Sequence, residues 1–153
     1  MDMEQLYVIH LKRRNTLRTL LSQKIYARTK VLQRRKGSPL LDIESRKVAF
    51  TYERLVKNFS AIKSLEDEFD DKFRLHPVLN VHYEDLVASP DSEFEHITNF
   101  LGLPFSRPRT HFAILNPEKL SVLLLNYEQL KKEFSGTEWA HFFEEKETAS
   151  AEL

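Results

Sequence analysis

The chain of 153 residues contains no cysteine and only three glycines, and these two shortages limit its chemistry. Without thiols it forms neither disulfides nor thiolate metal sites, so we expect no metal centre and nothing indicates an oxidising compartment. None of the three glycines lies in a phosphate-loop pattern between a strand and a helix. The sequence therefore lacks the glycine-rich loop with which many α/β proteins cradle the phosphates of a nucleotide.

Long hydrophobic runs are also missing. The apolar run that begins at Leu6 is far shorter than a membrane span, and Asp2 and Glu4 precede it. We therefore expect no signal peptide, no transmembrane helix and no membrane partner, which makes a soluble cytoplasmic protein the default. The length and a hydrophobic content of 41% suit one domain, which we expect over residues 1–143, followed by a flexible tail at 144–153.

The formal net charge is zero, but the charges are segregated along the chain. Residues 1–36 carry ten Lys or Arg and two acids, whereas the remainder carries thirteen basic and twenty-one acidic residues. This segregation indicates an anionic ligand at the N-terminal segment, either a nucleotide, a nucleic acid or an acidic partner surface. A solvated basic helix face explains the same pattern without a ligand, and both interpretations stay open.

The first strand-to-helix junction organises the rest of the chain. Residues 6–11 are apolar and rich in β-branched and aromatic side chains, so they predict a buried strand. A basic cluster follows at residues 12–14, and Asn15 or Thr16 can then cap a helix over about 15–32. The basic cluster is therefore expected where a strand ends and a helix begins.

This junction predicts an anion site. Helix N-termini beyond the carboxyl ends of parallel strands favour phosphate, through their unpaired N–H groups and the helix dipole. Arg14 at the junction offers a bidentate guanidinium fork, and Ser22, two turns into the helix, offers a single hydroxyl donor. The two side chains are suited to hold one phosphate from two sides.

The rest of the sequence alternates short apolar runs with long stretches of helical periodicity, which predicts an α/β protein with few parallel strands and long helices. The helix that follows Asp42 is expected to break near Lys63, and its aromatic stripe is interpreted as core packing. Residues 34–39 are expected to form a solvated helix end, and residues 104–117 an irregular loop. The expected elements are strands at about 6–12 and 78–83 and helices at about 15–32, 42–74, 90–101 and 118–134.

Three segments resemble the sulfotransferases, enzymes that transfer a sulfuryl group from the donor PAPS (3′-phosphoadenylyl sulfate). The pattern R-N-x(6)-S from Arg14 to Ser22 is similar to the segment that grips the 3′-phosphate of PAPS. Residues 81–87 and 100–104 resemble the V-x-Y-E-D-L and F-L-G-L segments of the same enzymes. Residues 116–139 are similar to the C-terminal region of the bacterial branch, so the three segments stand in family order.

The resemblance implies a P-loop-NTPase-like sulfotransferase fold that binds PAPS or its desulfated form, PAP. It implies that Arg14 and Ser22 hold the 3′-phosphate and that Tyr83 lies against the adenine. From the sequence alone, Tyr83 can equally be an ordinary half-buried tyrosine at a strand end. Glu84 and Asp85 look suited to acid–base work, but in the family this pair serves the fold, so we interpret it as a capping and ion-pairing device.

Two parts of the family pattern have no counterpart here. In sulfotransferases the P-loop-like segment that cradles the 5′-phosphosulfate, and the catalytic base, both precede the strand that corresponds to Leu6. No residue here matches either part, and His10 inside the strand is interpreted as a packed core histidine, so no catalytic residue is assigned. The fold is therefore expected to be incomplete, a fragment or half-enzyme whose partner is an N-terminal half or a second copy.

Two functions from different classes remain. The first is sulfuryl transfer from PAPS to an acceptor hydroxyl or amine, with this chain on the 3′-phosphate side of the donor. The alternative is a nucleotide- or nucleic-acid-binding module that uses the basic N-terminal helix. Such a module needs exposed aromatics among its cations, and only Tyr26 stands among Arg18, Lys24, Arg28 and Lys30. The first function is favoured because the second depends on a charge pattern alone, so a nucleic-acid partner is not expected.

Overall fold

The computed structural model describes residues 6–144, which fall into two compact units. The strand unit comprises residues 6–14 and 62–109, and the helical unit comprises residues 15–61 and 110–144. Helix α3 (Tyr52–Phe73) begins in the helical unit and ends in the strand unit. Apart from Glu144, the expected tail lies outside the described residues, and the single-domain interpretation stays a prediction.

A pair of parallel strands forms the centre of the strand unit. Strand β1 (Val8–Lys12) pairs with β3 (Val78–His82), and Val8 lies opposite Val78 in the register. Both strands and their parallel direction confirm the sequence prediction. Together with the flanking helices, they give the few-stranded parallel α/β arrangement that the sequence predicted.

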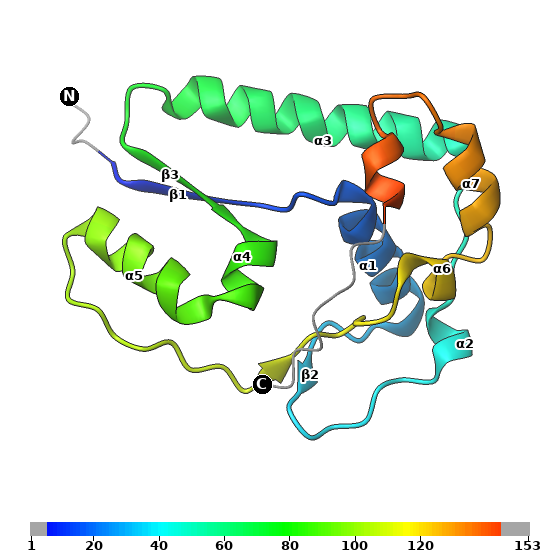
Figure 1. Cartoon of the computed structure of the whole chain (residues 1–153), viewed down its shortest axis with the longest axis horizontal. Helices are drawn as coiled ribbons and strands as arrows, with labels where there is room; N and C mark the ends of the chain where they lie inside the picture. The colour runs from blue at the N-terminus through cyan, green and yellow to red at the C-terminus, as the bar shows by residue number, and fades with distance from the viewer. Residues whose placement is uncertain (1–5, 145–153) are drawn as a thin grey trace. The chain divides into compact units, whose positions relative to one another are not determined.

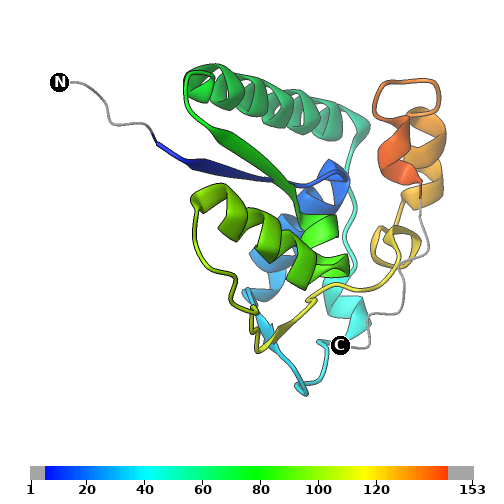
Figure 2. The same cartoon turned by 60° about the vertical axis from the view of Figure 1, so that its left-hand side comes forward.

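Helices cover opposite faces of this strand pair, as Figures 1 and 2 both show. On one face His10 packs against Phe69 of α3, with ring centroids 3.8 Å apart. On the other face Tyr7 meets Phe100 of α5 (Pro90–Leu101) edge to face at 5.4 Å. Because successive side chains of a strand alternate between its faces, the even-numbered residues of β1 face α3 and the odd-numbered residues face α5.

The boundaries of α5 follow from local sequence signals. Pro90 occupies the start of the helix, where the missing N–H costs no hydrogen bond, and Asp91 and Glu93 lie in the first turn, where acids suit the dipole. Gly102 ends the helix with φ of 67°, a left-handed conformation that favours glycine. The predicted helix is confirmed, and a short helix α4 (Tyr83–Ala88), which the sequence prediction missed, connects it to β3.

Helix α1 (Thr16–Thr29) opens the helical unit. The side chain of Asn15 caps it by accepting a hydrogen bond from the N–H of Arg18 at 3.1 Å, as one of the two predicted caps. The helix ends earlier than predicted, because Lys30 adopts a left-handed φ of 59°. Its buried residues follow the predicted helical spacing and are Leu17, Leu20, Leu21 and Ile25.

The hydrophobic core belongs almost entirely to the helical unit. Phe59 of α3 contacts the rings of Phe134, Trp139 and Phe142, with centroid separations of 5.7, 5.4 and 4.9 Å. This contact confirms that the aromatic stripe of the predicted long helix serves core packing. Of the seventeen buried hydrophobic side chains among the described residues, only Val81 belongs to the strand unit.

The helix predicted over residues 42–74 is two helices, and the expected break near Lys63 is wrong. Asp42 caps the short α2 (Ile43–Arg46), and α3 begins only at Tyr52. Between them Val48 donates its N–H to the carbonyl of Leu123 at 2.9 Å and accepts the N–H of Leu125 at 2.8 Å. Pairing with a distant segment therefore takes the backbone groups that a continuous helix would have used.

The same pairing interrupts the helix predicted over residues 118–134. The structure has α6 (Leu120–Leu123) and α7 (Tyr127–Glu133), and the intervening Leu124 forms an isolated parallel bridge with Val48. A short 3₁₀ helix, η1 (Ala140–Phe143), follows and places Phe142 and Phe143 in the core.

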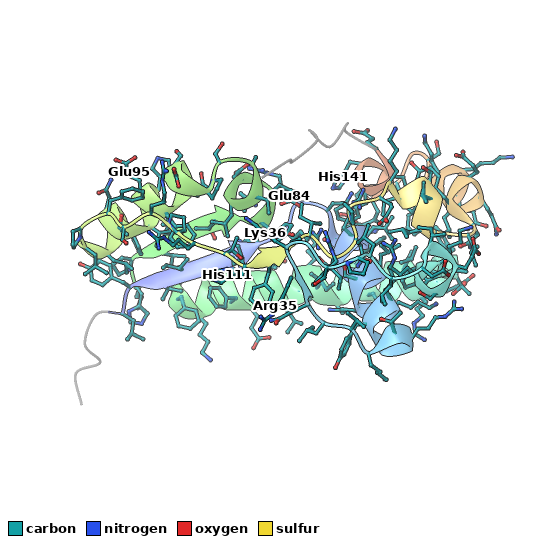
Figure 3. The ribbon with its side chains drawn as sticks, turned by 90° about the horizontal axis from the view of Figure 1, so that it is seen from below. Arg35, Lys36, Glu84, Glu95, His111 and His141 are labelled. Atoms are coloured by element: carbon teal, nitrogen blue, oxygen red, sulfur yellow. The ribbon has the colours of Figure 1, made fainter. Side chains whose placement is uncertain are left out.

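The prediction of a solvated helix end at residues 34–39 is also wrong. Strand β2 (Arg34–Arg35) pairs antiparallel with β4 (Phe112–Ala113), and the N–H of Lys36 donates to the carbonyl of His111 at 2.8 Å. Figure 3 labels Arg35, Lys36 and His111 on this ribbon. Both strands have only two residues, which is too short for an alternating pattern, so the sequence does not predict them.

A buried ion pair links α2 to the segment before α6. The guanidinium of Arg46 donates two hydrogen bonds to the carboxylate of Glu118 at 2.5 and 2.6 Å, and Arg18 donates to the Glu118 carbonyl at 2.8 Å. The Arg46 side chain is 3% exposed. Burial is the largest single effect and raises the pKa of Glu118. The hydrogen bonds and charge of Arg46, a backbone hydrogen bond and the charge of Arg18 together outweigh it, so the pKa lies below its ordinary value. The pair therefore contributes stability at neutral pH that is lost as the pH falls through this lowered pKa.

We predict that Glu118→Ala lowers the free energy of unfolding by on the order of 3 kcal/mol, because it leaves the Arg46 charge buried and unpaired. Urea denaturation followed by the fluorescence of Trp139, the only tryptophan, measures the loss. Asp67→Ala is the matched control, since it removes an exposed pair with Lys63 and should cost at most about 1 kcal/mol. Equal losses in the two variants would show that the buried ion pair contributes no more to the free energy of unfolding than an exposed one.

Candidate functional site

Charged side chains gather where β1 ends in the strand unit. Lys12 is the last residue of β1, and Arg13 and Arg14 follow it. Because β1 and β3 are parallel, their carboxyl ends lie at the same end of the strand pair. Helix α4 begins there with Tyr83 and Glu84. The N–H of Arg14 donates to Glu84 Oε2 at 3.1 Å, and Figure 3 labels Glu84. The two motifs that the sequence singled out therefore meet in one cluster.

Arg14 and Asp85 form a bidentate ion pair in this cluster. Arg14 Nη1 donates to Asp85 Oδ1 and Nη2 donates to Oδ2, both at 2.6 Å. The side chains are 51% and 42% exposed. The hydrogen bonds raise the pKa of Arg14 and lower that of Asp85. Asp85 is thus the ion-pairing carboxylate that the sequence predicted, and it takes two of the five N–H donors of the guanidinium.

Arg13 backs the aromatic ring of Tyr83. Its guanidinium carbon lies 4.6 Å from the ring centroid, and its Nε lies 3.8 Å from Glu84 Oε1. Burial lowers the pKa of Arg13, while Tyr83 and Glu84 partly offset that effect. The sequence prediction missed this residue. No signal in the sequence distinguished it from Arg14, because the orientation of each basic side chain depends on how the backbone turns after the end of β1.

Ser22 does not belong to the same unit as this cluster. It lies on α1, half-buried, and belongs to the helical unit, whereas Arg14 is the last residue of the strand unit. Of the three predicted ligand-binding residues, the cluster at the end of the strands therefore contains two, Arg14 and Tyr83. The contribution of Ser22 stays a prediction from the resemblance.

A second polar cluster lies on the α3 face of β1. Lys12 Nζ donates to Asp70 Oδ2 at 2.8 Å, and His10 Nδ1 lies 3.3 Å from Asp70 Oδ1. The hydrogen bond from Lys12 is the largest cause of the lowered pKa of Asp70. Because the His10 ring also packs against the ring of Phe69, at an interplanar angle of 39°, its place agrees with a packed histidine.

In a comparison with protein families, the model described as the sulfotransferase family matches residues 5–107. The chain belongs to the sulfotransferase family. The matched part includes the R-N-x(6)-S segment and the segment around Tyr83, and the mixed fold with its parallel strands agrees with the α/β fold of the family. No curated protein and no solved structure matches the chain.

The third segment of resemblance, residues 116–139, lies outside the matched part of this sulfotransferase-family chain. Membership of the bacterial branch therefore stays a prediction. Within residues 6–144, no helix has both the length and the apolar character needed to cross a membrane.

The ion pair makes a prediction about proton affinity. In Arg14→Ala, the pKa of Asp85 should rise toward its ordinary value of 3.8, because the hydrogen bonds that favour the carboxylate are lost. Titration of the side-chain carboxyl carbons by NMR measures this change. In the matched control Lys12→Ala, the pKa of Asp70 should rise instead and that of Asp85 should stay where it is in the wild type. An Asp85 pKa that is insensitive to Arg14→Ala would contradict the pairing.

Proposed function

We propose that this member of the sulfotransferase family binds the 3′-phosphoadenosine part of PAPS at the carboxyl ends of β1 and β3. One observation carries the proposal. Arg14 and Tyr83 come from two separate motifs of the sequence, and both border the same edge of the parallel strand pair. This is the edge at which open α/β sheets commonly bind nucleotides.

The arrangement around Arg14 suits a phosphate. Asp85 holds the outer fork of the guanidinium in a fixed direction, and the remaining N–H donors are the ones proposed to contact the 3′-phosphate. Arg13 adds a second positive charge beside Tyr83. Ser22 is proposed as the other phosphate donor from the resemblance of the R-N-x(6)-S segment.

Tyr83 is the proposed contact for the adenine. The Arg13 guanidinium occupies one face of its ring, so the adenine would stack on the opposite face. An aromatic ring held by a cation on one side is restrained before the base arrives, which reduces the ordering cost of binding.

PAPS supplies the sulfuryl group that the family transfers to an acceptor hydroxyl or amine. The residues of this chain bind and orient the 3′ side of the donor, and no residue of the chain is assigned as a base. We propose that a phosphate loop and a base come from another polypeptide segment, since the chain has no glycine-rich loop. We therefore expect the chain alone to bind PAP and to transfer no sulfuryl group.

The nucleic-acid-binding alternative gains no support from the basic helix. Lys24 and Arg28 of α1 donate to the backbone carbonyls of Ala49 and Lys47 within the helical unit. Arg18 donates to the carbonyl of Glu118. These cations stabilise their own unit, so the charge pattern of this helix does not require an external polyanion.

We predict that Arg14→Ala weakens the binding of PAP by roughly tenfold or more, because a charge-assisted hydrogen bond to the phosphate is lost. Isothermal titration calorimetry measures the affinity. Arg74→Ala is the control, because it removes an exposed arginine of the strand unit at a distance in sequence from both motifs. Adenosine 5′-phosphate, which lacks the 3′-phosphate, should bind the wild type and Arg14→Ala equally. Equal losses of PAP affinity in Arg14→Ala and Arg74→Ala would mean that Arg14 is not the phosphate ligand.

A stacking role for Tyr83 predicts different results for two substitutions. Tyr83→Phe keeps the ring and should leave PAP affinity within a factor of about three, whereas Tyr83→Ala should reduce it by about fivefold to a hundredfold. The same calorimetric titration measures both. If Tyr83→Phe lost as much affinity as Tyr83→Ala, the hydroxyl and not the ring would be the contact.

A further inference from the structure

Strand β1 has an open edge within the described residues. Its partner there is β3 alone, and the N–H of Val8 donates to the carbonyl of Pro77 at 2.9 Å. Successive residues of a strand direct their backbone groups to opposite edges, so the N–H and C=O groups of Ile9 and Leu11 point away from β3. An edge strand with unpaired backbone groups is a template for another strand.

Strand β1 and Tyr7, the residue directly before it, expose apolar side chains. Tyr7, Ile9 and Leu11 share the α5 face and are 57%, 40% and 55% exposed. Parallel sheets are normally covered on both faces, and a sheet of two strands is marginal by itself. Val81 is the only buried hydrophobic residue among the described residues of the strand unit. A partner that covers this edge would therefore stabilise the unit by burying further apolar surface.

The sequence around β1 is complementary to itself in the antiparallel direction. A two-fold axis at Ile9 would place Ile9 opposite Ile9 of a second copy and Leu11 opposite Tyr7. All three positions direct their backbone groups to the open edge, so the hydrogen-bonding pattern of an antiparallel ladder is satisfied. The apolar side chains then form one continuous cross-strand face.

Charge selects the antiparallel direction. Residues 12–14, Lys-Arg-Arg, follow the apolar run. Antiparallel alignment centred on Ile9 places Lys12 opposite the apolar Leu6 of the second copy, so the two basic clusters lie at opposite ends of the pair. Parallel alignment would bring the two basic clusters together, which is unfavourable, and a two-fold axis cannot generate it.

We propose that a second copy of this chain pairs with the open edge of β1, antiparallel and centred on Ile9. The resulting sheet has the strand order β3-β1-β1-β3 across the two copies. The dimer does not depend on the ligand proposed for Arg14 and Tyr83, so its failure and the failure of PAP binding are separate results.

Sedimentation equilibrium over micromolar to millimolar concentrations tests the dimer. We expect a monomer–dimer equilibrium for the wild type and a dissociation constant at least tenfold larger for Leu11→Lys, which puts a charge into the apolar face. Leu125→Lys is the matched control, because Leu125 is exposed to 65% in the helical unit and its variant should dimerise like the wild type. Circular dichroism verifies that both variants are folded. A wild type that stays monomeric, or a Leu11→Lys variant that dimerises normally, overturns the proposal.

The absence of native cysteine allows a test of the register. In the proposed dimer Ile9→Cys faces itself across about 5.5 Å between Cα atoms, which is within disulfide range. Leu11→Cys faces Tyr7, and the two thiols lie about 13 Å apart along the strands. Mild oxidation should therefore cross-link Ile9→Cys much faster than Leu11→Cys, as measured by non-reducing electrophoresis. Equal rates would overturn the register.

Two further outcomes assign the edge differently. Species that grow beyond a dimer with concentration indicate open-ended association and overturn the two-fold pairing. A wild type that stays monomeric and associates only with a polypeptide carrying the N-terminal half of a sulfotransferase assigns the edge to that partner and also overturns the proposal.

Discussion

The parallel hydrogen bonding of β1 with β3 is the constraint on which the candidate site depends. It brings the carboxyl ends of β1 and β3 to the same end of the strand pair, although the two strands are far apart in the sequence. An antiparallel pair of the same five-residue strands would separate Arg14 from Tyr83 by roughly 16 Å. The Arg14–Asp85 ion pair and the stacking of Arg13 on Tyr83 both follow from that shared end.

The two units divide stability and chemistry between them. The helical unit contains the aromatic cluster around Phe59 and the buried pair of Arg46 with Glu118. The strand unit contains the charged cluster but only one buried hydrophobic residue among those described, Val81. Regions with few buried apolar contacts are the ones that open at low free-energy cost, which suits a surface that is proposed to bind a ligand.

The sequence predicted the elements whose limits are set locally. Asn15 caps α1, while Pro90 and Gly102 bound α5, and each acts through its nearest neighbours. The two interrupted helices were not predictable in this way, because the interruptions arise from pairing of Val48 with Leu123 and Leu125. The β2–β4 ribbon was missed for the same reason, since hydrogen bonds between distant segments leave no periodic signal.

The candidate site was predicted in part. Arg14 and Tyr83 were identified by resemblance, and the parallel strands bring their segments together. Arg13 was missed because the sequence does not show which of three adjacent basic side chains faces Tyr83. Only the backbone conformation determines that orientation. Ser22 stays a prediction, since it belongs to the other unit.

The pairing of Arg14 with Asp85 has a consequence for selectivity among anions. The carboxylate acts as a resident counter-ion, so an incoming monoanion such as chloride meets a guanidinium that is already neutralised. A phosphate monoester carries close to two negative charges at neutral pH and presents three acceptor oxygens, and it can use donors that Asp85 leaves. Because Asp85 repels every incoming anion, the proposed phosphate would have to be held by hydrogen bonds from the donors that Asp85 leaves, and its three oxygens can accept several of them together.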